Sequence, residues 1–337
     1  MATPSRRPTV GIVTPAWADA NNGNWQTARR WALMLSAHYR VQLLRQWPAA
    51  EASVAPDVLI ALHARRSAAS IAAWATQYPH RPVLLALTGT DLYRDIEHDA
   101  SAQQSLALAH RLIVLQEAGP QQLPHAYQHK CSVVFQSSTS RKTLAKTQQH
   151  LNVVVVGHLR VEKSPQTVFE IAQALTPNDG IRITHLGAAL DPALGHAAQT
   201  TAQNLPHYRW MGGVSHAQAR QHIQRAHVLL HPSRMEGGAH VIMEAITSGT
   251  AVLASKVPGN IGMLGAHYTG LFEWGDAAGA CHLLRQCRQS LGMGLNSPNN
   301  LLAQLTAQCQ QRAHLFAPAA EAAALHAVVA QALHTSS

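Results

Sequence analysis

Two glutamates separated by seven residues, Glu236 and Glu244, are the residues whose type and spacing best suit the binding of a ligand. Gly237 and Gly238 follow the first glutamate, and their N–H groups, with that of Ala239, can face an anion at the start of a helix. Glu244 falls about two helical turns later, so both carboxylates can project toward one ligand. This stretch therefore predicts a site for a negatively charged ligand.

The sequence around the two glutamates predicts the elements that hold them. The apolar run 226–230 is typical of a buried strand, residues 232–238 of a loop, and 239–248 of a helix that Gly249 ends. The run AVLAS at 251–255 predicts the next strand. The loop follows the carboxyl end of its strand, which is the edge where open α/β sheets bind ligands.

Pro232 and Ser233 before the first glutamate, and the glycines after it, resemble the E-x7-E motif of retaining GT-B glycosyltransferases of the GT4-like group. In that family the first glutamate contacts the donor sugar and the second binds the ribose of a nucleotide sugar. A carboxylate suits a ribose because it accepts hydrogen bonds from two neighbouring hydroxyls. The resemblance implies a catalytic Glu236, a donor-binding Glu244, and donor contacts from Arg234, Gly237, Gly238 and Ala239. The alternative is a core helix of a Rossmann-like domain with Glu244 on its solvated face.

The length of 337 residues suits two α/β domains of about 150 residues each. The resemblance implies an α/β GT-B fold, in which two Rossmann-like domains face each other across a cleft. We expect an acceptor domain at 1–148, ending in a polar interdomain linker at 137–150, and a donor-binding domain at 149–317. The Ala-rich stretch 318–335 predicts a C-terminal helix that crosses back to the first domain.

The formal net charge of +9 would suit nucleic acid or an anionic small substrate. No run of lysine or arginine exceeds two residues and only 5% of residues are aromatic, so phosphorylated small molecules are favoured. The four cysteines lack C-x-x-C spacing, and neither a run of 18 apolar residues nor a secretory signal is predicted. We expect a cytoplasmic enzyme that uses no metal or cofactor and binds no nucleic acid or membrane. Its oligomeric state stays open.

The first half of the chain predicts six strands, at 8–14, 39–45, 57–63, 82–87, 111–116 and 131–136. His63 ends the third strand and precedes Arg65 and Arg66, a placement suited to handling an anion. We expect His63 to line the reaction centre as a catalytic residue and the two arginines to bind the acceptor. The alternative is a surface helix start with solvated arginines.

Two further loops in the first half are candidates for acceptor binding. Asn21, Asn22, Gly23 and Asn24 follow the first strand, where backbone N–H groups can face a phosphate. Thr90 and Asp91 follow the fourth strand. GT-B relatives use both loops near the acceptor. The alternative is that Asn24 and Asp91 only cap the helices that follow.

The second half opens with a predicted strand at 151–156, and the segment 157–165 after it is similar to the G-R-L…K segment of the GT4-like group. In that group an arginine and a lysine bind the donor diphosphate. Lys163 matches the lysine and is expected to be catalytic. His158 stands at the usual arginine position, where it is only partly charged at neutral pH. Arg160 is expected to compensate.

The nucleotide base is expected near residues 208–215, because the family reads the base with the backbone of this segment. The candidates are Trp210, Met211 and Gly212. The alternative for the Trp210 side chain is packing under the loop. A further strand is expected at 181–186 and a helix at 217–225. The segment LFEWGD at 271–276 is similar to the short family segment G-x-L-x-x-x-x-D.

Five segments together resemble a narrower group, the selenosugar synthase family of selenoneine biosynthesis. They are NNGNWQTARRWA, LIALHARRSAAS, LTGTDLYRDI, GHLRVEKSP and PSRMEGGAHVIMEA. That family joins a hexose from UDP-N-acetylglucosamine or UDP-glucose to selenophosphate, which gives a 1-selenosugar. The resemblance implies these small-molecule partners here. Because selenophosphate is an anion, its pocket should be positive, and our hypothesis places it at Arg65, Arg66, Asn24 and the first loop. The alternatives are a GT4-like enzyme with another small-molecule or lipid acceptor, and a non-catalytic protein that binds nucleotide sugars.

Overall fold

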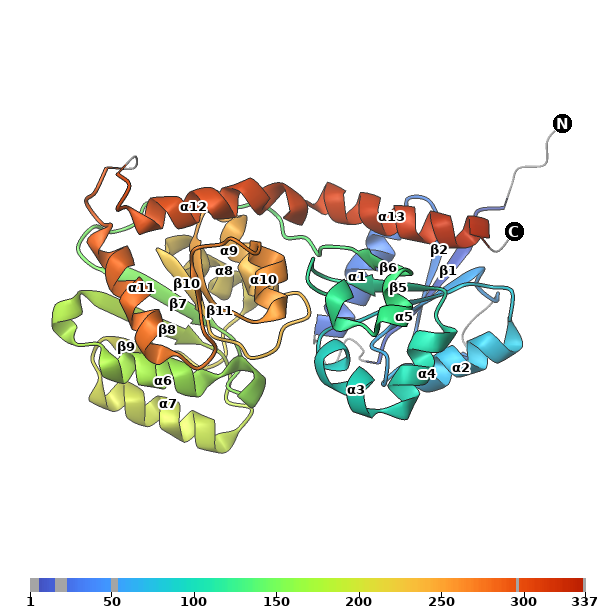
Figure 1. Cartoon of the computed structure of the whole chain (residues 1–337), viewed down its shortest axis with the longest axis horizontal. Helices are drawn as coiled ribbons and strands as arrows, with labels where there is room; N and C mark the ends of the chain where they lie inside the picture. Colours follow the sequence, from blue (N-terminus) through green and yellow to red (C-terminus); the bar gives the residue numbers. More distant parts are fainter. Residues whose placement is uncertain (1–5, 16–22, 50–53, 295–296, 336–337) are drawn as a thin grey trace. The chain divides into compact units, whose positions relative to one another are not determined.

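The computed structural model describes residues 6–15, 23–49, 54–294 and 297–335. The chain divides into two compact units, one made of Met1–Gln136 with Pro318–Ser337 and the other of Ser137–Ala317. Each unit contains one parallel sheet with helices around it (Figure 1).

The sheet of the first unit has six strands in the order β2-β1-β3-β4-β5-β6, and every neighbouring pair is parallel. The strands are β1 (Thr9–Val13), β2 (Arg40–Leu44), β3 (Val58–Leu62), β4 (Val83–Ala86), β5 (Arg111–Val114) and β6 (Cys131–Val133). All six strands predicted from the sequence are therefore confirmed, each slightly shorter than its apolar run. Parallel strands read as continuous apolar runs because helices cover both of their faces.

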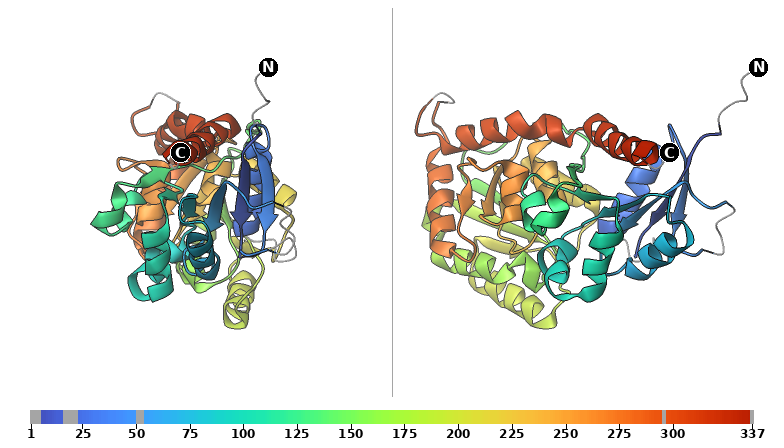
Figure 2. Two further views of the ribbon diagram at one scale, coloured as in Figure 1. Left: turned by 90° about the vertical axis from the view of Figure 1, so that its right-hand side faces the viewer. Right: turned by 45° about the vertical axis from the view of Figure 1, so that its right-hand side comes forward.

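Helices cover both faces of the first sheet (Figure 2). Alternate strand residues point to opposite sides: Ile12 and Ile60 pack with α1 (Gly23–Leu35) and α13 (Pro318–Thr335), whereas Leu59 and Leu85 pack with α2 (Ala68–Gln77) and α4 (Ala100–Leu108). A π-helical turn at Asp91–Asp95 and α3 (Ile96–His98) follow β4, and α5 (His125–Gln128) precedes β6.

Helix α13 belongs to the core of the first unit although it is the last element of the chain. Leu325 and Val329 are fully buried there, in one cluster with Trp31 of α1. Glu321 accepts a hydrogen bond of 2.8 Å from the Trp31 indole and pairs with Arg30 at 3.0 Å. The first sheet therefore depends on a helix that is separated from it by the whole second unit in sequence.

The sheet of the second unit also has six parallel strands, in the order β12-β11-β10-β7-β8-β9. The strands are β7 (Leu151–Val156), β8 (Ile181–Leu186), β9 (Tyr208–Trp210), β10 (Val228–His231), β11 (Ala251–Ser255) and β12 (Leu271–Phe272). The helices are α6 (Pro165–Ala174), α7 (Pro192–Asn204), α8 (His216–Arg225), α9 (His240–Ile246), α10 (Pro258–Leu264), α11 (Ala277–Gln289) and α12 (Leu301–Arg312). Two Rossmann-like units, as predicted, are confirmed.

Residues 137–150 differ from the polar linker that their composition predicts, because they are bound to the second unit. Thr143 Oγ1 donates to the Ser248 carbonyl at 3.1 Å, and Lys146 Nζ donates to the Gly249 carbonyl at 3.1 Å. These carbonyls lie beyond the carboxyl end of α9, where a helix leaves acceptors without partners. Gly249 has a φ of +69°, and an added Cβ would meet Thr143 Oγ1 at 2.3 Å. The polar side chains of this segment therefore complete the end of α9.

No single helix in the described part of the chain is long and apolar enough to cross a membrane. One bent pair of helices, Leu301–Phe316 and Pro318–His334, meets the requirement by length and composition alone.

Candidate functional site

The loop between β10 and α9 carries the E-x7-E motif and is fixed by a chain of hydrogen bonds. Ser255 Oγ, at the end of β11, donates to the Ser233 carbonyl at 2.5 Å. Asn260 of α10 in turn donates to both the carbonyl and the Oγ of Ser255, each at 3.0 Å. Gly259 is packed so closely that an added Cβ would lie 2.0 Å from the Glu236 carbonyl oxygen. The backbone that presents Glu236 is therefore held by two neighbouring elements.

Glu236 is 9% exposed and faces two basic side chains. Lys163 Nζ lies 2.5 Å from Glu236 Oε1, and His231 Nε2 lies 3.1 Å from the same oxygen. Burial by itself would raise the pKa of Glu236, but the charge of Lys163 and the contacts with Lys163 and His231 lower it well below its usual range. Glu236 is therefore an ionised, buried carboxylate.

Glu244 lies in α9, is 3% exposed and faces α8. His216 Nε2 lies 2.5 Å from Glu244 Oε1, and an Arg220 guanidinium nitrogen lies 3.7 Å from that oxygen. The hydrogen bond to Glu244 raises the pKa of His216, although partial burial works in the opposite direction. Arg220 also binds the Ser138 hydroxyl and the Thr139 carbonyl, which hold its guanidinium in place. No motif indicates His216 or Arg220, because both contact Glu244 from a neighbouring helix.

The segment after β7 brings Lys163 to Glu236 but directs His158 elsewhere. His158 Nδ1 accepts a hydrogen bond of 3.1 Å from the Ala188 N–H. Burial and the charges of Arg160 and Lys163 lower the pKa of His158, so its ring is neutral at pH 7. Arg160 is half exposed and lies 4.0 Å from Glu162. Of the three predicted diphosphate ligands, Arg160 and Lys163 carry charge, and the His158 ring mainly orders the 188–190 loop.

The segment Tyr208–Ser215 holds the three residues predicted to bind the base. The Trp210 indole donates to the Gly187 carbonyl at 2.9 Å, which is the packing role considered as its alternative. The Met211 N–H donates to the His185 carbonyl, and the Gly212 carbonyl accepts from the Gly187 N–H. Gly212 has a φ of +66°, a conformation that favours glycine. These bonds tie the segment to the end of β8, next to the loop that His158 orders.

Arg234 and residues 237–239, the other predicted donor-binding residues of the E-x7-E loop, have different environments. Arg234 stacks its guanidinium 4.9 Å from the centre of the Trp274 ring, and its N–H donates to the Glu162 carbonyl. The latter bond joins the E-x7-E loop to the Lys163 segment. Gly237, Gly238 and Ala239 precede α9 directly, and none of their N–H groups donates to another residue that the structure describes.

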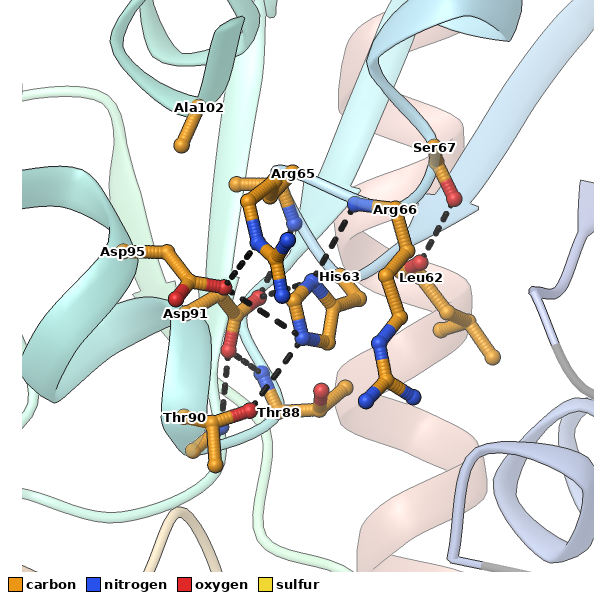
Figure 3. A network of polar contacts seen from close by, with 12 residues as sticks. Leu62, His63, Arg65, Arg66, Ser67, Thr88, Thr90, Asp91, Asp95 and Ala102 are labelled. Carbon is orange, nitrogen blue, oxygen red and sulfur yellow. Dashed lines mark hydrogen bonds and ion pairs between the residues drawn. The ribbon is translucent and has the colours of Figure 1, made fainter. Parts of the chain in front are cut away.

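A second polar cluster lies at the carboxyl end of β3 in the first unit (Figure 3). His63 is 2% exposed and has a φ of +74°, which is strained for a residue with a side chain. His63 Nδ1 lies 3.4 Å from the Arg66 N–H that donates to it, and Nε2 lies 3.2 Å from Thr90 Oγ1. This arrangement places the ring proton on Nε2. Burial lowers the pKa of His63, against the opposing effect of Asp91, so the ring is neutral at pH 7.

Asp91 and Asp95 give this cluster its shape (Figure 3). Asp91 is fully buried; it accepts from the N–H groups of Thr88 and Gly89, each at 2.9 Å, and from that of Ala64 at 3.0 Å. It therefore joins the loops after β3 and β4 instead of capping a helix. Asp95, which the sequence did not indicate, binds Arg65 at 2.9 Å and Arg94 at 3.1 Å. Burial raises the pKa of Asp95, whereas its hydrogen bonds to Arg65 and Arg94 and their charges lower it. The second effect is larger, so the pKa of Asp95 is below its usual value.

The two arginines that follow His63 therefore differ. Arg65 is neutralised by Asp95, whereas no acidic side chain among the described residues pairs with the exposed Arg66. Gly23 and Asn24 form the start of α1, and the Gly23 carbonyl accepts from Thr27 Oγ1 at 2.8 Å. Asn21 and Asn22 lie outside the described residues.

No group of three histidine, cysteine or carboxylate side chains in the described ranges is arranged to hold a metal ion. A cavity of about 340 Å³ lies at the amino-terminal edge of the second sheet, lined by Gln149, His150, Pro177, Gly180, Ile181, Arg182, Pro206 and His207. It contains none of the predicted site residues and lies at the edge opposite to the E-x7-E loop.

Comparisons with known proteins agree with this architecture. Residues 136–277, which form most of the second unit, match the family described as glycosyl transferases group 1. No curated protein sequence matches the chain.

Solved structures share the fold of both units. Sucrose-phosphate synthase of Thermosynechococcus elongatus has a TM-score of 0.72 at 14% identity, with 98% of this chain and 100% of that chain covered. HepE of Anabaena, in complex with UDP-glucose, has a TM-score of 0.70 at 14% identity, with 96% and 100% covered. TarM of S. aureus, in complex with UDP and two further ligands, has a TM-score of 0.63 at 11% identity. This chain is covered over 82% but spans only 55% of TarM. The fold is that of GT-B glycosyltransferases.

Proposed function

We propose that the protein is a UDP-sugar-dependent glycosyltransferase that forms a carbon–selenium bond. It transfers a hexose, N-acetylglucosamine or glucose, from a UDP-sugar to the selenium of selenophosphate, which gives a hexosyl selenophosphate and UDP. Cleavage of the selenium–phosphorus bond by water then releases phosphate and leaves the 1-selenosugar. The observation that supports the donor half most directly is the pair of buried carboxylates, Glu236 and Glu244, each facing basic groups in a unit of glycosyl transferase group 1. HepE and TarM, which share this fold, were crystallised with UDP or a UDP-sugar.

Different residues of the second unit bind different parts of the nucleotide sugar. Glu244 accepts the ribose hydroxyls, and Glu236 accepts a hydroxyl of the hexose. Lys163 and Arg160 bind the diphosphate, because an ammonium and a guanidinium offset the charge that UDP gains as it leaves. The backbone N–H groups of residues 237–239 donate further hydrogen bonds to the sugar or the diphosphate. The backbone of residues 210–212 contacts the base.

The reaction needs little help from a general base. The bond between the anomeric carbon and the terminal phosphate oxygen breaks, and UDP leaves with the electron pair. A lone pair on the selenium of selenophosphate forms the new carbon–selenium bond. Because this selenium is already anionic, the barrier depends mainly on the stabilisation of UDP and of the positive charge on the sugar ring.

The acceptor is assigned to the cluster around His63 in the first unit. Arg66 is exposed and has no acidic partner in the described part of the chain, so its guanidinium can bind the phosphate of the acceptor. Neutral His63 donates its Nε2–H to Thr90 Oγ1, so the Thr90 hydroxyl proton is the uncharged donor directed at the acceptor. Asn24 is assigned to the acceptor from the start of α1. The strained backbone of His63 fits a functional position, since such strain persists where the surroundings enforce it.

The test is an anaerobic incubation with UDP-N-acetylglucosamine or UDP-glucose, with and without selenophosphate, and with Glu244→Gln as the matched control. Released UDP and the sugar product are followed by mass spectrometry. We expect UDP release that depends on selenophosphate, together with a selenium-containing hexose or its phosphate. At donor concentrations below saturation, both should be reduced about tenfold or more with the control. UDP release with other nucleophiles but not with selenophosphate would assign a different acceptor. UDP binding without any turnover would show a protein that only binds nucleotide sugars.

A further inference from the structure

Three buried polar atoms near Glu236 have no hydrogen-bond partner in the described part of the chain. They are Nε2 of His231, Oγ of Ser233 and Oδ1 of Asn260. All three residues are at most 2% exposed. Buried polar atoms normally have partners, and an unpartnered group calls for an explanation such as a ligand site. The three lie on the E-x7-E loop or on the segments bonded to it, so the neighbourhood of Glu236 contains spare hydrogen-bonding capacity.

His231 is the one of these residues that faces the glutamate. It is the last residue of β10, so its backbone is fixed by the sheet. Its Nε2 lies 3.1 Å from Glu236 Oε1 but outside the direction of a good hydrogen bond. Lys163 Nζ contacts the same oxygen at 2.5 Å. Both neighbours therefore use Oε1, and among the described residues no hydrogen bond reaches Oε2.

The protonation of His231 follows from its surroundings. Burial lowers the pKa of His231 and the charge of Lys163 lowers it too, while contact with Glu236 raises it, and the net pKa is below its usual value. The ring is therefore neutral at pH 7. A neutral imidazole must direct its N–H and not its lone pair at an ionised carboxylate, so the proton is on Nε2.

Lys163 and His231 hold Glu236 in different ways. Lysine is a mobile point charge on a flexible stem, and the proposed function gives it a second partner in the donor diphosphate. His231 is rigid and buried, so it stays beside Oε1 when Lys163 turns to the diphosphate. A small rotation of Glu236 would then align the His231 N–H and complete its missing hydrogen bond.

We propose that His231 is a positioning residue of the donor site. It holds Glu236 through Oε1 so that Oε2 accepts a hydroxyl of the donor hexose. This proposal rests on the proposed function, because it requires a sugar beside Glu236. A UDP-sugar should bind more tightly than UDP because its hexose contacts Glu236. His231 should contribute to this gain in affinity and should not affect the affinity for UDP itself.

Titration calorimetry with UDP and with UDP-N-acetylglucosamine or UDP-glucose measures this gain in affinity as the ratio of the two Kd values. We expect His231→Leu to reduce the ratio about tenfold, the size of one lost hydrogen bond to a charged group, with the Kd for UDP unchanged. His231→Gln should keep most of the ratio, because a glutamine amide nitrogen reaches the position of Nε2. His231→Asn has the same chemistry but does not reach, and should behave like His231→Leu. This pair of polar variants decides the question even if His231→Leu fails to fold.

Glu236→Gln supplies the second half of the test. If His231 acts through Glu236, then adding His231→Leu to Glu236→Gln should cost nothing further in the ratio. An unchanged ratio in folded His231→Leu, or equal weakening of UDP and UDP-sugar, would overturn the assignment of His231 alone. A wild-type protein that binds UDP tightly but gains nothing from either hexose would overturn the proposed donor and the role of His231 together.

Discussion

The contact between His216 and Glu244 predicts that the affinity for UDP depends on pH. His216 contacts Glu244 Oε1, one of the two carboxylate oxygens that the proposed ribose contact of Glu244 requires. The hydrogen bond to Glu244 raises the pKa of His216, and Arg220 and Arg141 are the other charged groups that face its ring. Below that pKa the imidazolium holds Glu244 and competes with ribose. As the pH rises through it, the ring loses its charge and its hold on Glu244 weakens. UDP should therefore bind more tightly at higher pH.

The size of this effect is limited by exposure. The His216 side chain is 74% exposed, so solvent screens the pair, and an exposed ion pair contributes about 0.2–1 kcal/mol. The Kd for UDP should fall by up to about fivefold between pH 6 and a pH above the raised pKa. His216→Gln cannot titrate and should abolish this dependence while binding UDP more tightly at low pH.

Titration calorimetry with UDP across this pH range, in two buffers to correct for proton release, is the assay. His222→Gln is the matched control, since His222 is on the same helix and its charged neighbours are arginines. A dependence on pH that is the same in wild type and His216→Gln would refute the competition between His216 and ribose.

Three further predictions concern other parts of the two clusters. Glu244→Ala should weaken UDP binding by about 1.5–3 kcal/mol in calorimetry, and unchanged affinity in a folded variant would remove Glu244 from the ribose role. Asp91→Ala leaves three backbone N–H groups without their acceptor and should lower the free energy of unfolding by about 3 kcal/mol in urea; a change below about 0.5 kcal/mol would contradict its joining role. Arg66→Ala should raise the KM for selenophosphate about tenfold and leave the Kd for UDP unchanged, whereas the exposed Arg40→Ala should change neither.

The fold could be predicted because a buried parallel strand can be recognised from a few consecutive residues of the sequence. Most strands are short apolar runs, and most of the loops that end them carry glycine or proline, although the loop after β3 carries neither. Residues 137–150 show where this fails. Their polar composition is typical of a linker, but Thr143 and Lys146 satisfy carbonyls at the end of α9, about a hundred residues later. Composition does not record a partner so far along the chain.

The candidate site could be predicted only as far as its motifs extend. Glu236, Glu244 and Lys163 are recognised by spacing, and the structure buries the first two among basic groups. The side chains that contact these glutamates, such as His231 and His216, belong to no motif because they reach the glutamates through space from a neighbouring strand or helix. Asp95 could not be predicted either, because the π-helical turn Asp91–Asp95 brings its carboxylate to Arg65 and no sequence motif indicates that contact.

The position of α13 has a consequence for the order in which the protein folds during synthesis. The second unit is continuous in sequence, so a ribosome releases all of it before the last helix appears. The first unit lacks the helix that covers Trp31 and pairs with Arg30 until residues 318–335 have emerged. Domains usually complete their folding in the order of synthesis. In this chain the first unit is the first to be synthesised but the last to complete its folding. Until then the apolar face that α13 covers is exposed, and chaperones can bind it.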